Sequence, residues 1–259
     1  MSSIDHYENF PVASWLCPAK LRPAVVALYH FARTADDLAD EGNDPAHHRL
    51  DALGEYRADL ESCLKLSNAM STQWPNIFAA LHHAVAQHHL PAQPLFDLLD
   101  AFEQDVVYTS VGQGYRHRAE LLDYCRRSAN PVGRLMLHLY GVSDNASLTQ
   151  SDAICTALQL INFWQDRAED LQRGRDYLPQ GHTLEQELRF ARELMMQGAP
   201  LARRVKGRAG WELRAMVQGG LRILDKLDAR ANTADHRQLE RPKLKKTDFA
   251  RIAWRCLVM

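Results

Sequence analysis

The sequence predicts an all-α protein that forms a single domain. In nearly every long segment, apolar residues recur every three to four positions, which is the period of an α-helix. Runs of alternating β-branched residues, which would indicate strands, are absent, and so is any internal repeat. The chain has 259 residues, of which 46% are hydrophobic, enough for one large core. We therefore expect one helical domain over residues 1–259.

Proline, glycine and small polar residues mark where the helices of the first half begin and end. Pro18 and Pro23 punctuate the start of the first helix, and Gly42-Asn43-Asp44-Pro45 stops it. The second helix carries an apolar stripe that includes Leu53 and Leu60. The helices predicted in this half are 21–40, 46–66, 75–90 and one that begins at Pro94.

A loop around Gly112 and Gly114, flexible by composition, precedes the second half. There we expect a helix over 119–140, which Pro131 should kink because proline lacks the amide hydrogen. The other helices predicted in this half are 149–172, 184–197, 200–231 and 248–257.

Charge and cysteine content exclude several classes of function. The formal net charge is −1, so no overall field attracts the chain to nucleic acid or to anionic lipid. No apolar stretch approaches the ~20 residues of a membrane span, and the N-terminus lacks the features of a signal peptide. The five scattered cysteines form no CxxC pair, and no histidines have the spacing of a zinc site. We therefore expect a cytoplasmic protein with reduced thiols and no zinc.

The most informative stretch is an acidic run near the end of the predicted helix 149–172. Asn162, Asp166 and Asp170 are four residues apart, so on a helix they share one face, about 6 Å from one to the next. A second pair, Asp36 and Asp40, ends the first helix in the same way. Both sets follow apolar helix turns, where carboxylates are costly to bury unless a cation lies between them.

Oxygen ligands without cysteine or histidine favour Mg²⁺ that holds a phosphate group. Metal charge on a diphosphate makes it a good leaving group, so that the organic part of a substrate can ionise. Arg33, Arg173 and Arg175 could hold the departing diphosphate through charge-assisted bonds, and Tyr124 could act as a placed acid or base. The alternative is that both acidic runs are solvated helix ends.

An ionised substrate also needs an apolar cavity that excludes water. Seven apolar residues near these motifs are candidates for its lining, although each could equally belong to the core. They are Phe31, Leu38, Val132, Leu135, Leu158, Ile161 and Phe163.

Four segments resemble the squalene/phytoene synthase family, and together they extend the resemblance over nearly the whole chain. They are Tyr29-x-Phe31-x-Arg33-x-x-Asp36-Asp37-x-x-Asp40, Tyr124-Cys125-x-x-Ser128-Ala129-x-x-Val132-Gly133, Leu158-Gln159-Leu160-x-Asn162-x-x-x-Asp166-x-x-x-Asp170 and Arg173-Gly174-Arg175-x-Tyr177-Leu178-Pro179. More narrowly, residues 6–14 and 128–135 resemble the hydroxysqualene synthase branch of that family, which serves bacterial hopanoid biosynthesis.

The resemblance implies an all-α isoprenoid synthase fold with three Mg²⁺ ions and prenyl diphosphate substrates. It implies that Arg33 binds diphosphate. The metal ligands that it implies are Asp36, Asp40, Asn162, Asp166 and Asp170. The pocket residues that it implies are His6, Tyr124, Gln159 and, more loosely, Arg241.

Two positions depart from the family pattern. Gln165 stands where an arginine usually precedes the first aspartate of the second acidic run, and Asn9 replaces a serine. The missing arginine removes a fixed charge beside the diphosphates, which favours an enzyme that binds one diphosphate over one that joins two. Gln165 could instead orient a water molecule, because its amide both donates and accepts hydrogen bonds.

The resemblance therefore implies that presqualene diphosphate is ionised, rearranged and captured by water, which gives hydroxysqualene and diphosphate without NADPH. One alternative is a condensing synthase that makes presqualene diphosphate, phytoene or dehydrosqualene from two prenyl diphosphates. Another is a catalytically silent helical partner in an isoprenoid complex. A weak contact with the inner face of a membrane and a functional coupling to other enzymes of the squalene pathway are compatible with so apolar a product.

Overall fold

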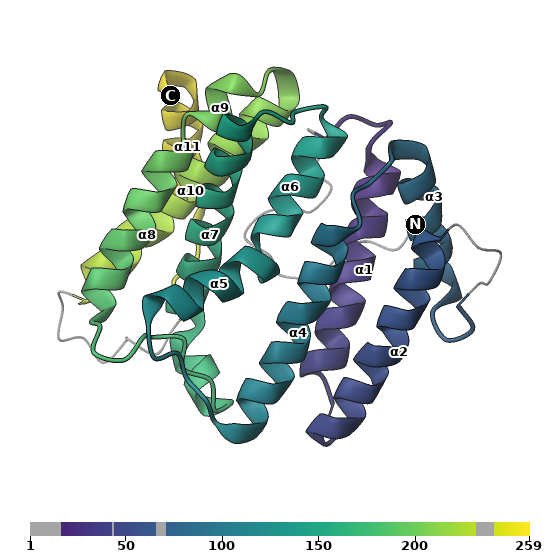
Figure 1. The fold of residues 1–259 in the computed structure, drawn as a ribbon. Coiled ribbons are helices and arrows are strands. Elements are labelled where there is room, and N and C mark those ends of the chain that lie inside the picture. The colour runs from purple at the N-terminus through teal and green to yellow at the C-terminus, as the bar shows by residue number, and fades with distance from the viewer. Residues whose placement is uncertain (1–16, 43, 66–70, 232–240) are drawn as a thin grey trace.

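The regular structure of the chain is helical (Figure 1). The computed structural model describes residues 17–42, 44–65, 71–231 and 241–259, and within these ranges it contains helices and no strand. The helices are α1 Arg22–Asp40, α2 Ala46–Leu64, α3 Pro75–His88, α4 Gln93–Val111, α5 Arg118–Ser128, α6 Asn130–Leu139, α7 Asn145–Gln172, α8 Leu184–Gly198, α9 Leu201–Arg204, α10 Gly207–Ala231 and α11 Lys246–Val258. The predicted all-α class is confirmed, and the single domain over 1–259 stays a prediction.

Two hydrophobic cores lie side by side. The helices α1 to α4 enclose the first, which is built around Phe31, Tyr56 and Leu99. The helices α5, α7, α8 and α10 enclose the second, which includes Leu160 and Leu188. In Figure 1 these two groups form the right and left parts of the molecule, with α6 between them.

The short helix α6 contributes to both cores. Leu135 belongs to the first core and Leu137 to the second, and each is nearly completely buried. At the start of α6, the side-chain oxygen of Asn130 accepts a buried hydrogen bond of 2.9 Å from the hydroxyl of Thr156 in α7. Because α6 buries apolar residues on two sides, the two halves cannot part without exposing them to water.

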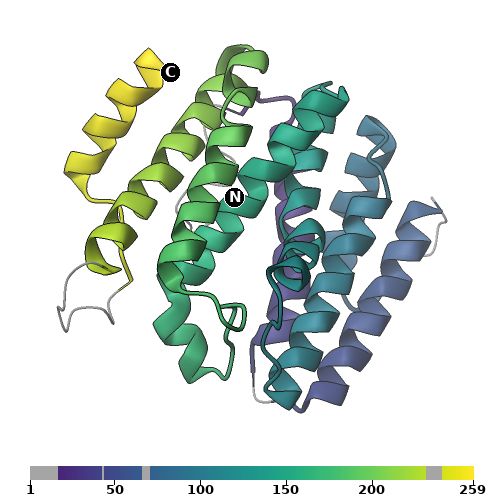
Figure 2. The same ribbon diagram turned by 60° about the vertical axis from the view of Figure 1, so that its left-hand side comes forward.

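The C-terminal ends of α1, α4 and α7 lie at the same end of the molecule, the lower edge of Figures 1 and 2. Each of these helices carries acidic residues near that end: Asp36 and Asp40 in α1, Asp105 in α4, and Asp166 and Asp170 in α7. Carboxylates that lie far apart in the sequence are thereby gathered at one end of the helical bundle.

Two of the predicted helices are each divided in the structure. The expected kinked helix 119–140 is two helices, α5 and α6, which meet at Ala129, where φ is −114° and ψ is −46°. The expected helix 200–231 is also two, α9 and α10, and Gly207 at the start of α10 has a φ of +70°. Both single-helix expectations were wrong, because Pro131 and Gly207 interrupt the helical hydrogen bonds rather than bend the helix.

The helix α7 begins four residues before its expected start. The side chain of Asp144 accepts a hydrogen bond of 2.9 Å from the amide of Ser147, so it caps the helix at this point. The polar residues just before position 149, which lie outside the expected helix, are therefore the cap and first turn of α7.

The helices α7 and α8 approach each other closely at Gly198, the last residue of α8. A Cβ atom at this position would lie 2.5 Å from Cγ1 of Ile154 and 2.6 Å from the carbonyl oxygen of Gln150, both in α7. The carbonyl belongs to the backbone of a long helix and cannot turn aside as a side chain could. Only glycine allows this approach.

We expect the substitution Gly198→Ala to lower the free energy of unfolding by roughly 1–3 kcal/mol, the usual cost of an extra carbon in a packed interface. Gly54→Ala in α2 is the control, because nothing lies within 4 Å of a Cβ there. Alanine is favoured over glycine inside a helix by about 0.5–1 kcal/mol, so this control should be slightly stabilised. Denaturant unfolding measures both variants, and an unchanged stability of Gly198→Ala would contradict the close packing.

Candidate active site

The candidate site is formed by two acidic ladders. We call Asp36 and Asp40 the α1 ladder, and Asn162, Asp166 and Asp170 the α7 ladder. The carboxylate-bearing side chains are partly sheltered: that of Asp36 is 39% exposed, that of Asp40 27% and that of Asp166 26%. Partly sheltered carboxylates interact with nearby charges more strongly than fully solvated ones.

Arg175 brings the two ladders together. It lies in the loop just after α7, and its backbone amide donates a hydrogen bond of 2.9 Å to the carbonyl of Asp170. Its guanidinium binds both carboxylate oxygens of Asp40, at 2.9 and 2.5 Å, and its Nε donates to the hydroxyl of Thr109 in α4 at 2.9 Å. The pKa of Arg175 is raised by the bond to Asp40, so the guanidinium stays charged.

The carboxylates of the ladders disfavour one another's charged forms. Burial, followed by the charge of Asp40, raises the pKa of Asp36 to about 6. Burial, followed by the charge of Asp166, raises the pKa of Asp170 to about 6, and Asp40 adds to this shift across the site. The structure thus places the two ladders within electrostatic reach of each other, in a region that favours added positive charge.

Two further arginines each pair with one ladder. Arg33 in α1 binds Asp36 at 3.1 Å and the neighbouring Asp37 at 2.6 Å. Arg241, which follows α10 in the chain, places its Nε 2.5 Å from Asp166. Together with Arg175, guanidinium groups from three separate segments reach the ladders, and each has the planar fork that binds carboxylate or phosphate.

Gln165 lies beside Asp166 but turns to a different partner. Its side chain is buried, and its Nε2 donates a hydrogen bond of 2.6 Å to the carbonyl of Pro242. This bond fixes the segment that carries Arg241 against α7. The expected role of Gln165 in orienting water stays a prediction.

Sequence analysis did not identify Asp105 of α4. The hydroxyl of Tyr124 donates to its carboxylate at 2.5 Å. Burial raises the pKa of Asp105 to about 7, although the Tyr124 bond and the charge of Arg175 act in the other direction. The charges of Asp40 and Asp36 raise it further, which places Asp105 electrostatically within the same site.

Aromatic rings surround the Tyr124–Asp105 pair. The rings of Phe163 and Tyr177 stack with centroids 3.8 Å apart, and Tyr124 lies against both at 6.0 and 6.3 Å. Tyr115 completes the group at 6.0 Å from Tyr124. A cleft beside these rings is lined by residues that include Asp105, Tyr108, Thr109, Tyr115, Gly174, Arg175 and Tyr177. This cleft has a volume of about 10 Å³, the space of roughly one water molecule, and the rings around Tyr124 belong to the buried core.

The residue spacing in α4 places Asp105 on a buried face of the helix. Leu98 and Ala101 are buried on one face of α4, and Asp105 follows Ala101 by four residues on the same face. A carboxylate that continues a buried apolar stripe is costly unless it is bonded or functional. The same criterion also selects Glu103, which follows the buried Leu95 and Leu99 at the same spacing, so the sequence alone did not single out Asp105.

The other residues named from the sequence are placed less centrally. Gln159 is half-buried on α7, Asn162 is exposed one turn before Asp166, and Arg173 is exposed at the end of α7. The charge of Arg173 nevertheless acts to lower the pKa of Asp170. His6 and Asn9 lie outside the described residues.

Most of the apolar candidates belong to the cores. Phe31, Leu135 and Ile161 are almost fully buried among core residues. Val132 is 47% exposed, and Phe163 belongs to the aromatic group beside Tyr124. The half-buried candidates are Leu38 and Leu158. Phe163 is itself a buried member of the second core, and none of the seven lines the cleft beside Tyr115 and Tyr177.

Comparison with known proteins assigns the chain to a family. The model of the family "Squalene/phytoene synthase" matches residues 5–187. The chain belongs to this family. Over 174 residues it is 41% identical to a hydroxysqualene synthase of Zymomonas mobilis, a stretch that covers 66% of this chain and 54% of that protein. A presqualene diphosphate synthase of the same organism is 32% identical over 172 residues, which cover 66% of this chain and 56% of that protein.

The aligned part of the chain thus spans about half the length of these curated relatives. The crystal structure of the squalene synthase HpnC from Alicyclobacillus acidocaldarius aligns with a TM-score of 0.76 and 33% identity, over 87% of this chain and 89% of that one. The fold is therefore the all-α isoprenoid synthase fold, as the resemblance of the motifs implied.

We expect Asp105→Asn to weaken the pH dependence of stability in the metal-free chain. The folded-state pKa of Asp105, about 7, lies above its ordinary value of 3.8, so the folded chain holds this proton more tightly than the unfolded chain. The stability from this carboxyl is complete below about pH 4 and is lost as the pH rises through about 7. The variant should therefore melt a few degrees higher at pH 8, since ~1 kcal/mol shifts the melting temperature by about 2–4 °C.

Thermal melts in the presence of EDTA, from acid to pH 8, measure this effect. Asp123→Asn in α5 is the control: burial would raise the pKa of Asp123, but bonds from Arg126 and Arg127 outweigh it and the pKa is lowered. The control should gain no stability at pH 8. A pH profile of Asp105→Asn that coincides with that of the unchanged chain would refute the assigned environment.

Proposed function

We propose that the chain catalyses the Mg²⁺-dependent ionisation and rearrangement of presqualene diphosphate, with capture of the cation by water to give hydroxysqualene and diphosphate. The observation that carries the proposal is the pairing of three arginines with the two ladders. Arg175 binds Asp40, Arg33 pairs with Asp36, and Arg241 pairs with Asp166. Such a site can hold metal ions and a diphosphate together. The higher identity to a hydroxysqualene synthase than to a presqualene diphosphate synthase of the same organism supports the specific reaction.

The residues of the ladders fit Mg²⁺ by their chemistry. Within the described part of the chain, no three His, Cys, Asp or Glu side chains converge as a ready-made metal cluster. Magnesium ions in phosphate-handling sites commonly use only one or two carboxylates and complete their shell with water and substrate phosphates. Asp36 and Asp40 would hold one side of the bound ions, and Asn162, Asp166 and Asp170 the other. Up to three Mg²⁺ ions, when bound, would withdraw negative charge from the diphosphate and so make it a better leaving group.

The three arginines would bind and orient the diphosphate. In the structure, Arg33, Arg175 and Arg241 are paired with ladder carboxylates. Each guanidinium retains N–H groups that can donate hydrogen bonds to phosphate oxygens. Hydrogen bonds between charged groups are roughly twice as strong as those between neutral groups. Their charge would also hold the departing diphosphate and delay its return to the cation.

Asp105 and Tyr124 would serve the last proton transfer. When water adds to a carbocation, the new oxygen carries a positive charge and must lose one proton to become a hydroxyl group. The Asp105 carboxylate, with a pKa raised to about 7, is a base matched to neutral pH. The 2.5 Å bond from Tyr124 holds it in place, and the adjoining aromatic rings keep bulk water from the cation.

The nearest rival is a synthase that joins two prenyl diphosphates head to head. The similarity to the squalene synthase HpnC of Alicyclobacillus acidocaldarius favours it, as does the similarity to the presqualene diphosphate synthase. A synthase of this kind must neutralise two diphosphates at once, and Gln165 offers no charge for the second. Incubation with farnesyl diphosphate alone distinguishes the two reactions.

We expect Asp36→Asn and Asp166→Asn each to lower turnover by more than about 100-fold, because each removes a charged metal ligand. Both variants should stay folded, and Asp36→Asn should melt no lower than the unchanged chain without metal, since it relieves repulsion from Asp40. Asp152→Asn is the control, because this residue shares α7 with Asp166 but pairs with Arg134 instead. Product release from presqualene diphosphate measures turnover, and full activity in either ladder variant would exclude the metal assignment.

The reaction itself is tested by its product and its oxygen source. With Mg²⁺ and presqualene diphosphate, the chain should form an alcohol without NADPH, and ¹⁸O-water should place the label in the hydroxyl group. Farnesyl diphosphate should be converted poorly or not at all. Rapid product from farnesyl diphosphate alone, or a requirement for NADPH, would exclude hydroxysqualene formation and leave the broader family chemistry.

A further inference from the structure

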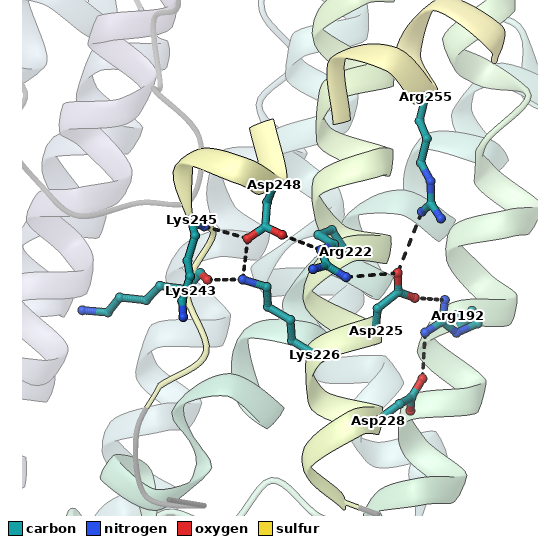
Figure 3. Close-up of polar contacts among 9 residues, drawn as sticks. All are labelled: Arg192, Arg222, Asp225, Lys226, Asp228, Lys243, Lys245, Asp248 and Arg255. Carbon is teal, nitrogen blue, oxygen red and sulfur yellow. Dashed lines mark hydrogen bonds and ion pairs between the residues drawn. The ribbon is translucent and has the colours of Figure 1, made fainter. Parts of the chain in front are cut away.

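Polar side chains bind the start of α11 to α10 (Figure 3). Asp248, which is 3% exposed, accepts bonds from Nε of Arg222 at 2.6 Å and Nζ of Lys226 at 2.5 Å. The backbone amide of Lys245 donates a third bond of 2.7 Å. Burial opposes the charged form, but these bonds lower the pKa of Asp248, so the carboxylate remains an anchor at neutral pH.

A second polar contact holds the later part of α11. Arg255 lies 3.8 Å from Asp225 of α10, which also pairs with Arg192 of α8 at 3.1 Å, as Figure 3 shows. Ile252 and Cys256 are buried on the same side of α11 as Asp248. This inner side of α11 is therefore occupied by charged, bonded side chains and two buried apolar ones.

The opposite side of α11 is apolar and exposed. At about 100° per residue, the residues of this side form one continuous arc of the helix. They are Phe249, Ala250, Ala253, Trp254, Leu257 and Val258, and all are exposed. The exposed fraction is 57% for Phe249, 66% for Trp254 and 64% for Leu257. A surface helix normally turns its apolar side inward and its charges outward, so α11 has the reverse arrangement. We call this arc the α11 outer face.

Basic residues concentrate in the same segment. Six of them lie between positions 241 and 259, and Asp248 is the only acidic residue there. The formal charge of the segment is therefore +5, whereas that of the whole chain is −1. Lys246 and Arg251 are exposed on α11 itself; Lys246 lies at the N-terminal end of the apolar arc, and Arg251 lies at its edge. The large apolar side chains of the outer face are thus accompanied by positive charge.

We propose that the α11 outer face binds the surface of an anionic lipid bilayer. Aromatic and aliphatic side chains, with tryptophan among them, insert at the boundary between headgroups and acyl chains, while lysine and arginine contact anionic headgroups. The helix has 13 residues, a length of about 20 Å, so it lies along the surface. None of the described helices combines the length and apolar character that crossing a bilayer requires.

Charge favours a lipid surface over a second copy of the chain. Two copies joined through this face would bring the exposed Lys246 and Arg251 of both copies together, and like charges oppose such a contact. An anionic bilayer instead complements both the charge and the apolar side chains. The polar anchors of Figure 3 hold α11 in place, so the outer face is presented without rearrangement.

Vesicle sedimentation tests the proposal and requires no substrate, so its result is independent of the proposed reaction. The full chain should sediment with vesicles of equimolar phosphatidylcholine and phosphatidylglycerol, and much less with phosphatidylcholine alone. The triple variant Phe249→Gln, Trp254→Gln, Leu257→Gln should bind at least about 100-fold more weakly, given the apolar area it removes. Lys246→Glu with Arg251→Glu should weaken binding by about tenfold or more.

The control is Met196→Gln, which changes an apolar side chain of α8 that is 57% exposed and lies outside the outer face. It should bind vesicles as the unchanged chain does, and circular dichroism verifies that every variant is folded. Equal sedimentation of the triple variant and the unchanged chain would overturn the proposal. So would equal binding to neutral and anionic vesicles, or a dimer in solution that the triple variant abolishes.

Discussion

The site depends on one electrostatic constraint, the crowding of partly buried carboxylates at the ends of α1 and α7. Burial is the largest cause of the raised pKa values of Asp36 and Asp170, each about 6, and the charges of Asp40 and Asp166, respectively, are the next. Arg175 offsets the repulsion, because its guanidinium binds both oxygens of Asp40 while its amide is bonded to the carbonyl of Asp170. A neutral residue at position 175 would leave the two helix ends without this shared cation.

The same constraint explains why arginine supplies the compensating charges. A guanidinium can bind carboxylate or phosphate with the same planar fork, whereas a lysine offers a single point charge. Arg33, Arg175 and Arg241 come from α1, from the loop after α7 and from the segment after α10. In the proposed reaction, each of these guanidinium groups would exchange a carboxylate partner for a diphosphate oxygen. Because they lie on three separate segments, no one helix or loop would have to move far.

The ladders could be predicted from the sequence because the spacing of four residues fixes which side chains share a helix face. The contacts between elements could not. Gln165 bonds to Pro242, 77 positions away, and Arg175 bonds to Asp40, 135 positions away, and no local pattern encodes either pairing. Asp105 was missed for a different reason. The prediction rested on pairs of acidic residues at helical spacing, and no acidic residue stands three or four positions from Asp105 in α4.

Residues 241–245 connect the site to α11 through consecutive contacts. Arg241 pairs with Asp166, and the carbonyl of Pro242 accepts from Gln165. The carbonyl of Lys243 accepts a bond of 2.6 Å from Lys226, the same side chain that binds Asp248 in α11.

Hydrogen bonds require a narrow range of distances and angles, so these contacts define the position of the segment. Polar anchoring of α11 therefore serves the site as well as the outer face, because a shift of the helix would displace the arginine that neutralises Asp166.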